Sequence, residues 1–173
     1  MLDLLKLCNA LLNTKQYDNV IKYCDEHLKM KPNSGLAWYL KGIANQQKNR
    51  VEDAEKCFRK AASLDPQEPA NYHALGIVLF NEKRFDEALI LFQTSVLLTP
   101  NPNDMVLSAF CKLMLKRDDE AATTLRTAIE FDKKETIKVL EALFDEVYKN
   151  DKNTSENEKK ALRLKLKKLI SLK

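Results

Sequence analysis

Turn-forming and chemically reactive residues are scarce in this 173-residue chain. It has only three glycines, five prolines and two histidines. An all-β fold needs a turn about every 8–12 residues, so this small number of breakers argues against one. The chain also lacks a glycine-rich phosphate loop and any recognisable serine or cysteine nucleophile motif. We therefore expect no enzyme, no catalytic residue, and no bound cofactor or metal.

Secretion and membrane signals are also missing. The four cysteines form no CxxC pair, and the apolar N-terminal stretch carries Asp3 and Lys6 without a small-residue cleavage site. No apolar run approaches the ~18 residues that a membrane span needs. These features indicate a cytoplasmic protein with reduced thiols.

Charge is unevenly distributed along the chain. Residues 150–173 hold eight Lys/Arg and three Asp/Glu, whereas residues 1–149 hold 21 basic and 22 acidic groups. Only the C-terminal segment could therefore attract nucleic acid or an anionic membrane over a distance. Neither is expected as the main partner.

A period of about 34 residues dominates the sequence, a length typical of stacked repeat architectures. Pro32, Pro66 and Pro100 are equally spaced at this interval, and each follows a helical pattern. Other positions repeat with the same spacing: Trp38 and Tyr72; Gly42 and Gly76; Val20, Ala54 and Ala88; Cys24, Phe58 and Phe92; His27, Ala61 and Ser95. The period indicates an array of helical hairpins, each of which buries its apolar face against its neighbours.

The two central units carry the most specific pattern. Segments 37–66 and 71–100 both show an aromatic residue, glycine, alanine, an aromatic residue, a small residue and proline in the same order. This pattern resembles the tetratricopeptide-repeat (TPR) family. The resemblance covers residues 1–134 and implies an all-α, right-handed superhelix with repeats at 1–34, 35–68, 69–102 and 103–135. Trp38 and Tyr72 then hold the family's bulky packing position.

The first and fourth units fit the pattern more loosely. In the first, Cys8 and Cys24 take the places of glycine and phenylalanine. In the fourth, Phe110 is expected at the glycine position and Lys133 at the proline position, with one residue missing in the turn after Arg117.

Three further segments follow the fourth repeat. Residues 135–149 predict a capping helix, and residues 150–158 a polar linker. Residues 159–173 predict a basic amphipathic helix, in which Leu162, Leu166, Leu169 and Ile170 share one arc while Leu164 and Leu172 lie off it. This tail either docks weakly or conditionally on the body or extends as a solvated terminus.

The resemblance implies a binding groove on the concave face, which is lined by the first helix of each repeat. The residues expected there are Leu5, Asn9, Leu12, Tyr39, Ile43, His73, Ile77, Phe80, Leu107, Cys111 and Met114. Tyr39, Ile77 and Phe80 should then be substantially exposed in the free protein. The alternative is that some of these residues belong to the core between helices.

Two more specific sites are considered. The carboxylate clamp of TPR co-chaperones would require lysine, arginine and asparagine at Leu5, Asn9, Leu40, Ala70 and Ala74, where only Asn9 fits. The clamp is therefore rejected. Cys8, Cys24 and His27 are expected to meet, either as packing residues or, less favourably, as a thiol–imidazole or metal site.

The function predicted is a protein-interaction scaffold that binds an amphipathic helix or an apolar peptide segment in its groove. The alternatives are a small secretion chaperone of the TPR type, or an electrostatic adaptor that uses the basic tail on RNA or an anionic membrane. Because residues 1–12 are apolar almost all round, self-association through this helix is a further expectation.

Overall fold

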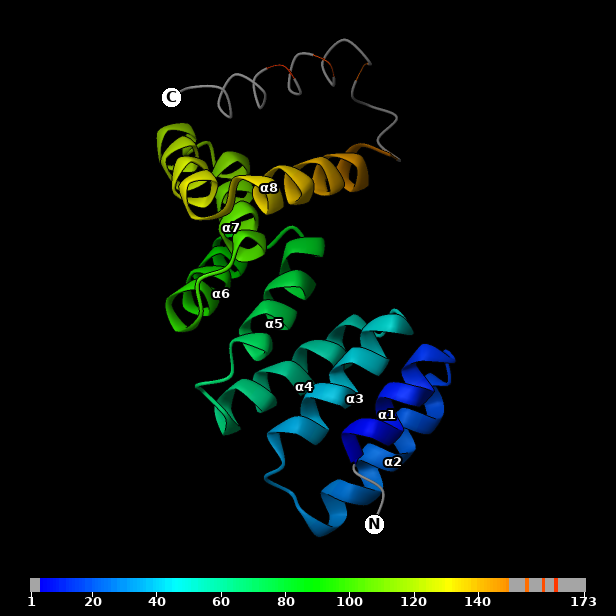
Figure 1. Ribbon diagram of the computed structural model, residues 1–173. Helices are drawn as coiled ribbons and strands as arrows, with labels where there is room; N and C mark the ends of the chain where they lie inside the picture. Colours follow the sequence, from blue (N-terminus) through cyan, green and yellow to red (C-terminus); the bar gives the residue numbers. More distant parts are fainter. Residues whose placement is uncertain (1–3, 150–154, 156–159, 161–163, 165–173) are drawn as a thin grey trace. The chain divides into compact units, whose positions relative to one another are not determined.

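The computed structural model describes residues 4–149 together with Ser155, Lys160 and Leu164. These residues form helices and no strand in the part described, so the prediction of an all-α fold is confirmed (Figure 1). The helices are α1 (Leu4–Asn13), α2 (Tyr17–Met30), α3 (Gly35–Gln47), α4 (Val51–Leu64), α5 (Pro69–Asn81), α6 (Phe85–Leu98), α7 (Pro102–Met114) and α8 (Asp118–Lys149). The predicted linker and tail otherwise lie outside the described residues.

The chain divides into two compact units. Unit 1 comprises residues 1–98 and holds three hairpins, α1/α2, α3/α4 and α5/α6. Unit 2 comprises residues 99–173, in which α7 packs against α8. No described helix is long and apolar enough to cross a membrane.

The period of the sequence is visible in the backbone of unit 1. Within each hairpin a three-residue turn carries one residue in the left-handed region, at Lys15, Asn49 and Lys83. The second helix of each hairpin ends two residues before one of the regularly spaced prolines. Proline cannot donate a backbone hydrogen bond and clashes with the preceding turn, so it stops the helix where the period predicts.

Two kinds of contact hold the hairpins of unit 1 together. Within a hairpin, a Cβ added at Gly42 would lie 2.6 Å from the ring of Phe58, and one added at Gly76 would lie 2.6 Å from the ring of Phe92. Glycine therefore lets each phenylalanine lie directly on the facing helix.

Successive hairpins pack α2 against α3 and α4 against α5, and a hydrogen bond at each connecting loop recurs with the same period. Trp38 Nε1 donates to the carbonyl of Pro32 at 3.1 Å, and Tyr72 Oη donates to the carbonyl of Pro66 at 3.1 Å. Both rings are partly buried. They act as structural residues, as the resemblance implied.

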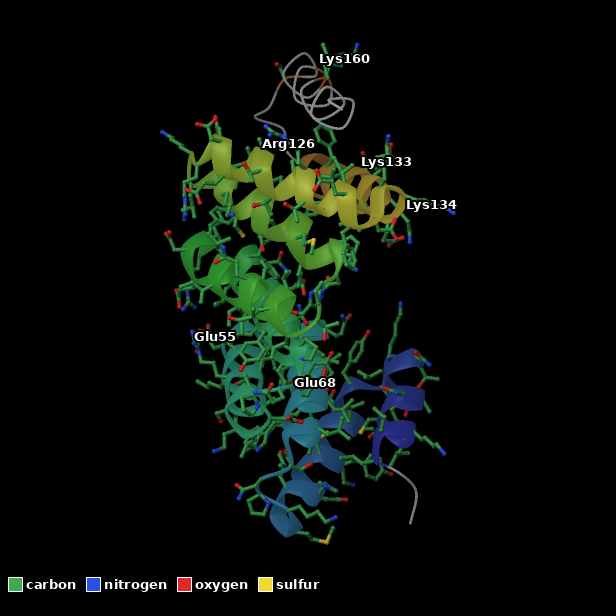
Figure 2. The ribbon with its side chains drawn as sticks, turned by 60° about the vertical axis from the view of Figure 1, so that its left-hand side comes forward. Glu55, Glu68, Arg126, Lys133, Lys134 and Lys160 are labelled. Atoms are coloured by element: carbon green, nitrogen blue, oxygen red, sulfur yellow. The ribbon has the colours of Figure 1, made fainter. Side chains whose placement is uncertain are left out.

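A network of four charges links α4 to the start of α6. Glu55 pairs with Arg59 at 2.7 Å and with Arg84 at 2.8 Å, and Glu87 pairs with Arg84 at 2.7 Å and with Arg59 at 3.4 Å. Burial alone would raise the pKa of the Glu55 carboxyl, but hydrogen bonds from both arginines outweigh this effect and lower the pKa. Figure 2 shows Glu55 on the surface of this unit.

The fourth hairpin begins one residue earlier than the period predicts. Pro102 begins α7 as Pro69 begins α5, and the left-handed Lys116 corresponds to Lys83. The loop before α7 has three residues (99–101), whereas residues 31–34 and 65–68 form four-residue loops. The missing residue therefore precedes α7, and the prediction that it follows Arg117 is wrong.

This shift changes the register of every residue on α7. Ala109, which is fully buried, occupies the glycine position that had been assigned to Phe110. The position on α8 that corresponds to Phe92 is Leu125, which is also buried.

Helix α8 is interrupted at Asp132, where the backbone leaves the helical region (φ −152°, ψ 96°). The side chain of Asp132 accepts a hydrogen bond from the amide of Glu135 at 3.0 Å and so caps the second half. The hydroxyl of Thr136, which is fully buried, donates to the carbonyls of Ala128 and Asp132. That residues 135–149 form a separate capping element stays a prediction.

Candidate protein-binding face

The predicted groove residues of unit 1 all lie on the first helices of its three hairpins. Of these, Leu5 and Asn9 are exposed. The remainder are partly buried: Leu12, Tyr39, Ile43, His73, Ile77 and Phe80. We call these eight residues the first-helix face of unit 1. Most of its side chains are apolar, and each retains some accessible surface.

Aromatic rings of the second helices support this face from behind. The ring centroid of Tyr39 lies 5.8 Å from that of Phe58, and His73 lies 6.3 Å from Phe92. Phe80 makes edge contacts with Phe92 at 6.4 Å and with Phe85 at 5.6 Å.

These contacts explain why Tyr39 and Phe80 are less exposed than expected; Ile77 is also partly buried. The glycines bring Phe58 and Phe92 close enough to the first helices to contact these rings. The face is therefore a supported apolar surface, in which side chains are held in place from one side and accessible from the other.

The polar groups of this face carry little positive charge. Burial, and secondarily the charge of Glu68, raises the pKa of Tyr39. Glu68 caps the start of α5 by accepting from the amide of Ala70 at 3.2 Å (Figure 2). On α3, Lys41 is held by Asp25 of α2 at 2.6 Å. The rejection of the carboxylate clamp stays a prediction.

Unit 2 does not present the residues that were predicted for it. Leu107 and Cys111 are buried, and only Met114 is exposed, at 48%. The reason is the one-residue shift of α7, because the positions that correspond to His73, Ile77 and Phe80 are Val106, Phe110 and Leu113. These three residues are not among those predicted from the sequence.

The corrected positions line an apolar pocket within unit 2. It is partly open to solvent, and the space in it and directly in front of it amounts to about 370 Å³. The lining residues are Val106, Phe110 and Leu113 of α7, Leu125 of the first half of α8, and Leu140, Leu143 and Phe144 of the second half. No polar side chain contributes to the lining.

Of the three residues expected to meet in the first hairpin, the structure brings Cys8 and Cys24 together. That His27 joins them stays a prediction. The sulfur atoms of Cys8 and Cys24 lie 3.9 Å apart, and both residues are fully buried. Burial raises the pKa of both thiols, so they remain protonated and unreactive. Within the described residues no three His, Cys, Asp or Glu side chains are placed to hold a metal ion. The geometry favours packing for this pair.

Two family models match overlapping parts of the chain. The model described as "Tetratricopeptide repeat" matches residues 5–69, and that of "Anaphase-promoting complex, cyclosome, subunit 3" matches residues 47–128. Together they cover the hairpins of unit 1 and the start of unit 2.

Curated relatives are much longer proteins. The chain is 30% identical to tetratricopeptide repeat protein 37 of Xenopus laevis over 50% of its own length, but over only 6% of that protein. It is 38% identical to the chloroplastic PsbB mRNA maturation factor Mbb1 of Chlamydomonas reinhardtii over 38% of its length and 10% of the relative. The chain therefore spans a small part of these relatives.

Solved structures share the fold. A MamA fragment from Desulfovibrio magneticus RS-1 superposes with a TM-score of 0.67 at 20% identity, covering 76% of this chain and 75% of that one. YrrB, titled as a TPR protein with an unusual peptide-binding site, gives a TM-score of 0.68 at 21% identity, covering 75% and 68%. At these identities the likeness establishes the architecture alone.

Proposed function

Because the chain belongs to the tetratricopeptide-repeat family, we infer that it serves as a protein-binding scaffold whose binding surface is the first-helix face of unit 1. Members of this family are generally non-catalytic scaffolds for other proteins. The ligand of this face is an amphipathic helix or an extended apolar segment of a partner protein.

The observation that carries this proposal is the support of accessible apolar side chains by aromatic rings of the second helices, of which Phe58 and Phe92 are buried. Tyr39 lies against Phe58, and Phe80 lies against Phe92 and Phe85. Anchors that are already fixed lose little conformational freedom on binding, so more of the contact energy appears as affinity. Binding hot spots are typically such well-packed aromatic and aliphatic groups.

Unit 2 contains a contact of the proposed kind within the chain itself. Leu140, Leu143 and Phe144 follow the i, i+3, i+4 spacing of a helix that anchors in a groove. Together with the α7 residues that correspond to the first-helix face of unit 1, they line one pocket. An apolar helix stripe thus fits against first-helix side chains of this protein.

The test uses two isoleucines of unit 1 that differ in location. Ile77 belongs to the first-helix face, whereas Ile90 lies on α6 and is 63% exposed. Peptides selected from a random phage library against the full chain serve as the probe. Their affinities for Ile77→Glu and Ile90→Glu are then measured by fluorescence anisotropy, with circular dichroism as the check of folding.

We expect Ile77→Glu to weaken binding at least about tenfold, because a buried unpaired carboxylate in the interface costs more than ~1.4 kcal/mol. The matched Ile90→Glu variant should bind as the wild type does. If the folded Ile77→Glu protein keeps its affinity while Ile90→Glu loses it, the binding surface lies on the second helices and the proposal is wrong.

A further inference from the structure

The apolar pocket of unit 2 is a surface that the proposed function does not use. Its seven lining residues are all aliphatic or aromatic, and it is partly open to solvent. Water in such a pocket finds no hydrogen-bonding group, so an apolar occupant is favoured over water.

We propose that the C-terminal segment 159–173 of the same chain binds over this pocket. Its sequence places Leu162, Leu166, Leu169 and Ile170 on one arc of a helix. In the proposed arrangement the apolar side chains of this arc pack against the apolar lining of the pocket, and the basic side chains of the segment remain in solvent. Leu164, which lies off the arc, is 56% exposed.

Charge favours this occupant over other apolar segments. Residues 159–173 contain seven Lys/Arg and no acidic residue, whereas α8 contains nine acidic and five basic residues. Glu141 is exposed on the helix that carries Leu140 and Leu143. The exposed cations Arg126, Lys133 and Lys134 belong to the part of α8 near Asp132 (Figure 2), and Lys138 is paired with Glu135 at 3.1 Å. A tail docked over the pocket would bring its cations next to this acidic helix.

The connection is long enough for the tail to reach the pocket. Residues 150–158 provide nine linking residues, which span up to ~30 Å when extended. The pocket residue Phe144 precedes the end of α8 by five residues, a rise of about 8 Å. A tethered segment within this range has an effective concentration of about the millimolar level, so even a weak contact is populated.

The experiment compares two variants of the full chain, in each of which two leucines of the tail are replaced by serine. In the arc variant, Leu166 and Leu169 are replaced by serine. In the matched control, the off-arc residues Leu164 and Leu172 are replaced by serine. Hydrogen exchange followed by mass spectrometry then reports amide protection in residues 137–145 and in the tail.

We expect the arc variant to exchange several-fold faster in both segments, and the control to match the wild type. Raising the salt from ~0.1 M to ~1 M should also reduce tail protection, because the screening length falls from ~10 Å to ~3 Å. Both variants leave the helices of the body unchanged, so loss of folding cannot imitate the result.

Three outcomes would overturn the proposal. The first is that the tail of the wild type exchanges as fast as an unprotected peptide, and the second is that the two variants exchange at the same rates. The third is that the protection disappears on dilution, which would identify a second copy of the chain as the occupant. The proposal is independent of the first-helix face of unit 1, since Ile77→Glu leaves the tail and the pocket intact.

Discussion

The third and fourth hairpins fill the same position with different side chains. In unit 1 a phenylalanine packs on a glycine, Phe92 on Gly76, and in unit 2 the corresponding residues are Leu125 and Ala109. Phe92 reaches past the glycine to contact His73 and Phe80. Leu125 is shorter and lines a pocket instead. Phe92 thus supports first-helix residues from behind, whereas Leu125 lines a pocket together with the first-helix residues Val106, Phe110 and Leu113.

The first hairpin shows a third combination at this position. Cys8 and Cys24 meet there with two side chains of similar size. The backbone accepts all three pairs because the combined volume, more than the identity of either residue, determines how closely the helices approach.

The largest expected effect on stability comes from removing the ring of Phe92, which is a leucine at the corresponding position of unit 2. Phe92→Ala should lower the free energy of unfolding by about 3–5 kcal/mol, because Phe92 is fully buried and leaves a cavity. Leu125→Ala should cost closer to ~2 kcal/mol, since Leu125 already borders an open pocket. Urea denaturation of both variants measures the difference. Equal losses would show that the pocket does not weaken the packing of Leu125.

A smaller effect is expected when the pair of unit 2 is built into unit 1. Gly76→Ala places a methyl group 2.6 Å from the ring of Phe92 and should cost about 1–3 kcal/mol through overpacking. Adding Phe92→Leu, which recreates the Ala109/Leu125 pair, should recover part of that loss. Thermal unfolding of the single and double variants tests this. Strictly additive losses would mean that the two positions do not share one volume.

The smallest effect concerns the charge network of unit 1, which links α4 to α6. In the described part of unit 2, Arg117 pairs with Glu120 and Lys138 pairs with Glu135, each within one turn of α8 or of its start. Glu55→Gln should destabilise the protein by about 1 kcal/mol or less at neutral pH, because the pairs are partly solvent-exposed. The pKa of Glu55 is lowered in the folded state, so its contribution is present above the unfolded value of about 4.3 and is lost as the pH falls through the folded value.

The difference in stability between wild type and Glu55→Gln should accordingly shrink below about pH 4. Denaturation at pH 7 and pH 3 measures it. A difference that is unchanged at pH 3 would show that the network acts through packing and not through charge.

Unit 1 was predictable from sequence because its landmarks are strong. Prolines end the helices, and glycines face phenylalanines, at one constant interval along the chain. The partial burial of Tyr39 and Phe80 was not predictable, because it depends on how deeply the facing rings reach between helices. No periodicity encodes that depth.

Unit 2 was harder because both landmarks change there. Alanine replaces glycine at residue 109, and no proline closes the helix near Asp132. A usable signal was present at the start of α7, where Asn101 caps the helix by accepting from the amide of Asp104 at 2.9 Å and Pro102 follows. Glu68 and Pro69 hold the same two positions at the start of α5. They precede Asn101 and Pro102 by one residue less than the full period, and this spacing places the missing residue before α7.

The self-association predicted for residues 1–12 stays a prediction.

The recurring bond from Trp38 to Pro32 and from Tyr72 to Pro66 has a consequence for how such chains lengthen over time. Each bond joins the aromatic ring of one hairpin to a main-chain carbonyl, an acceptor that every residue type supplies. A hairpin duplicated or deleted as a whole would therefore meet a compatible neighbour without any matching side-chain change. Length can vary by whole hairpins, while substitutions on the first helices alter the partner that is bound.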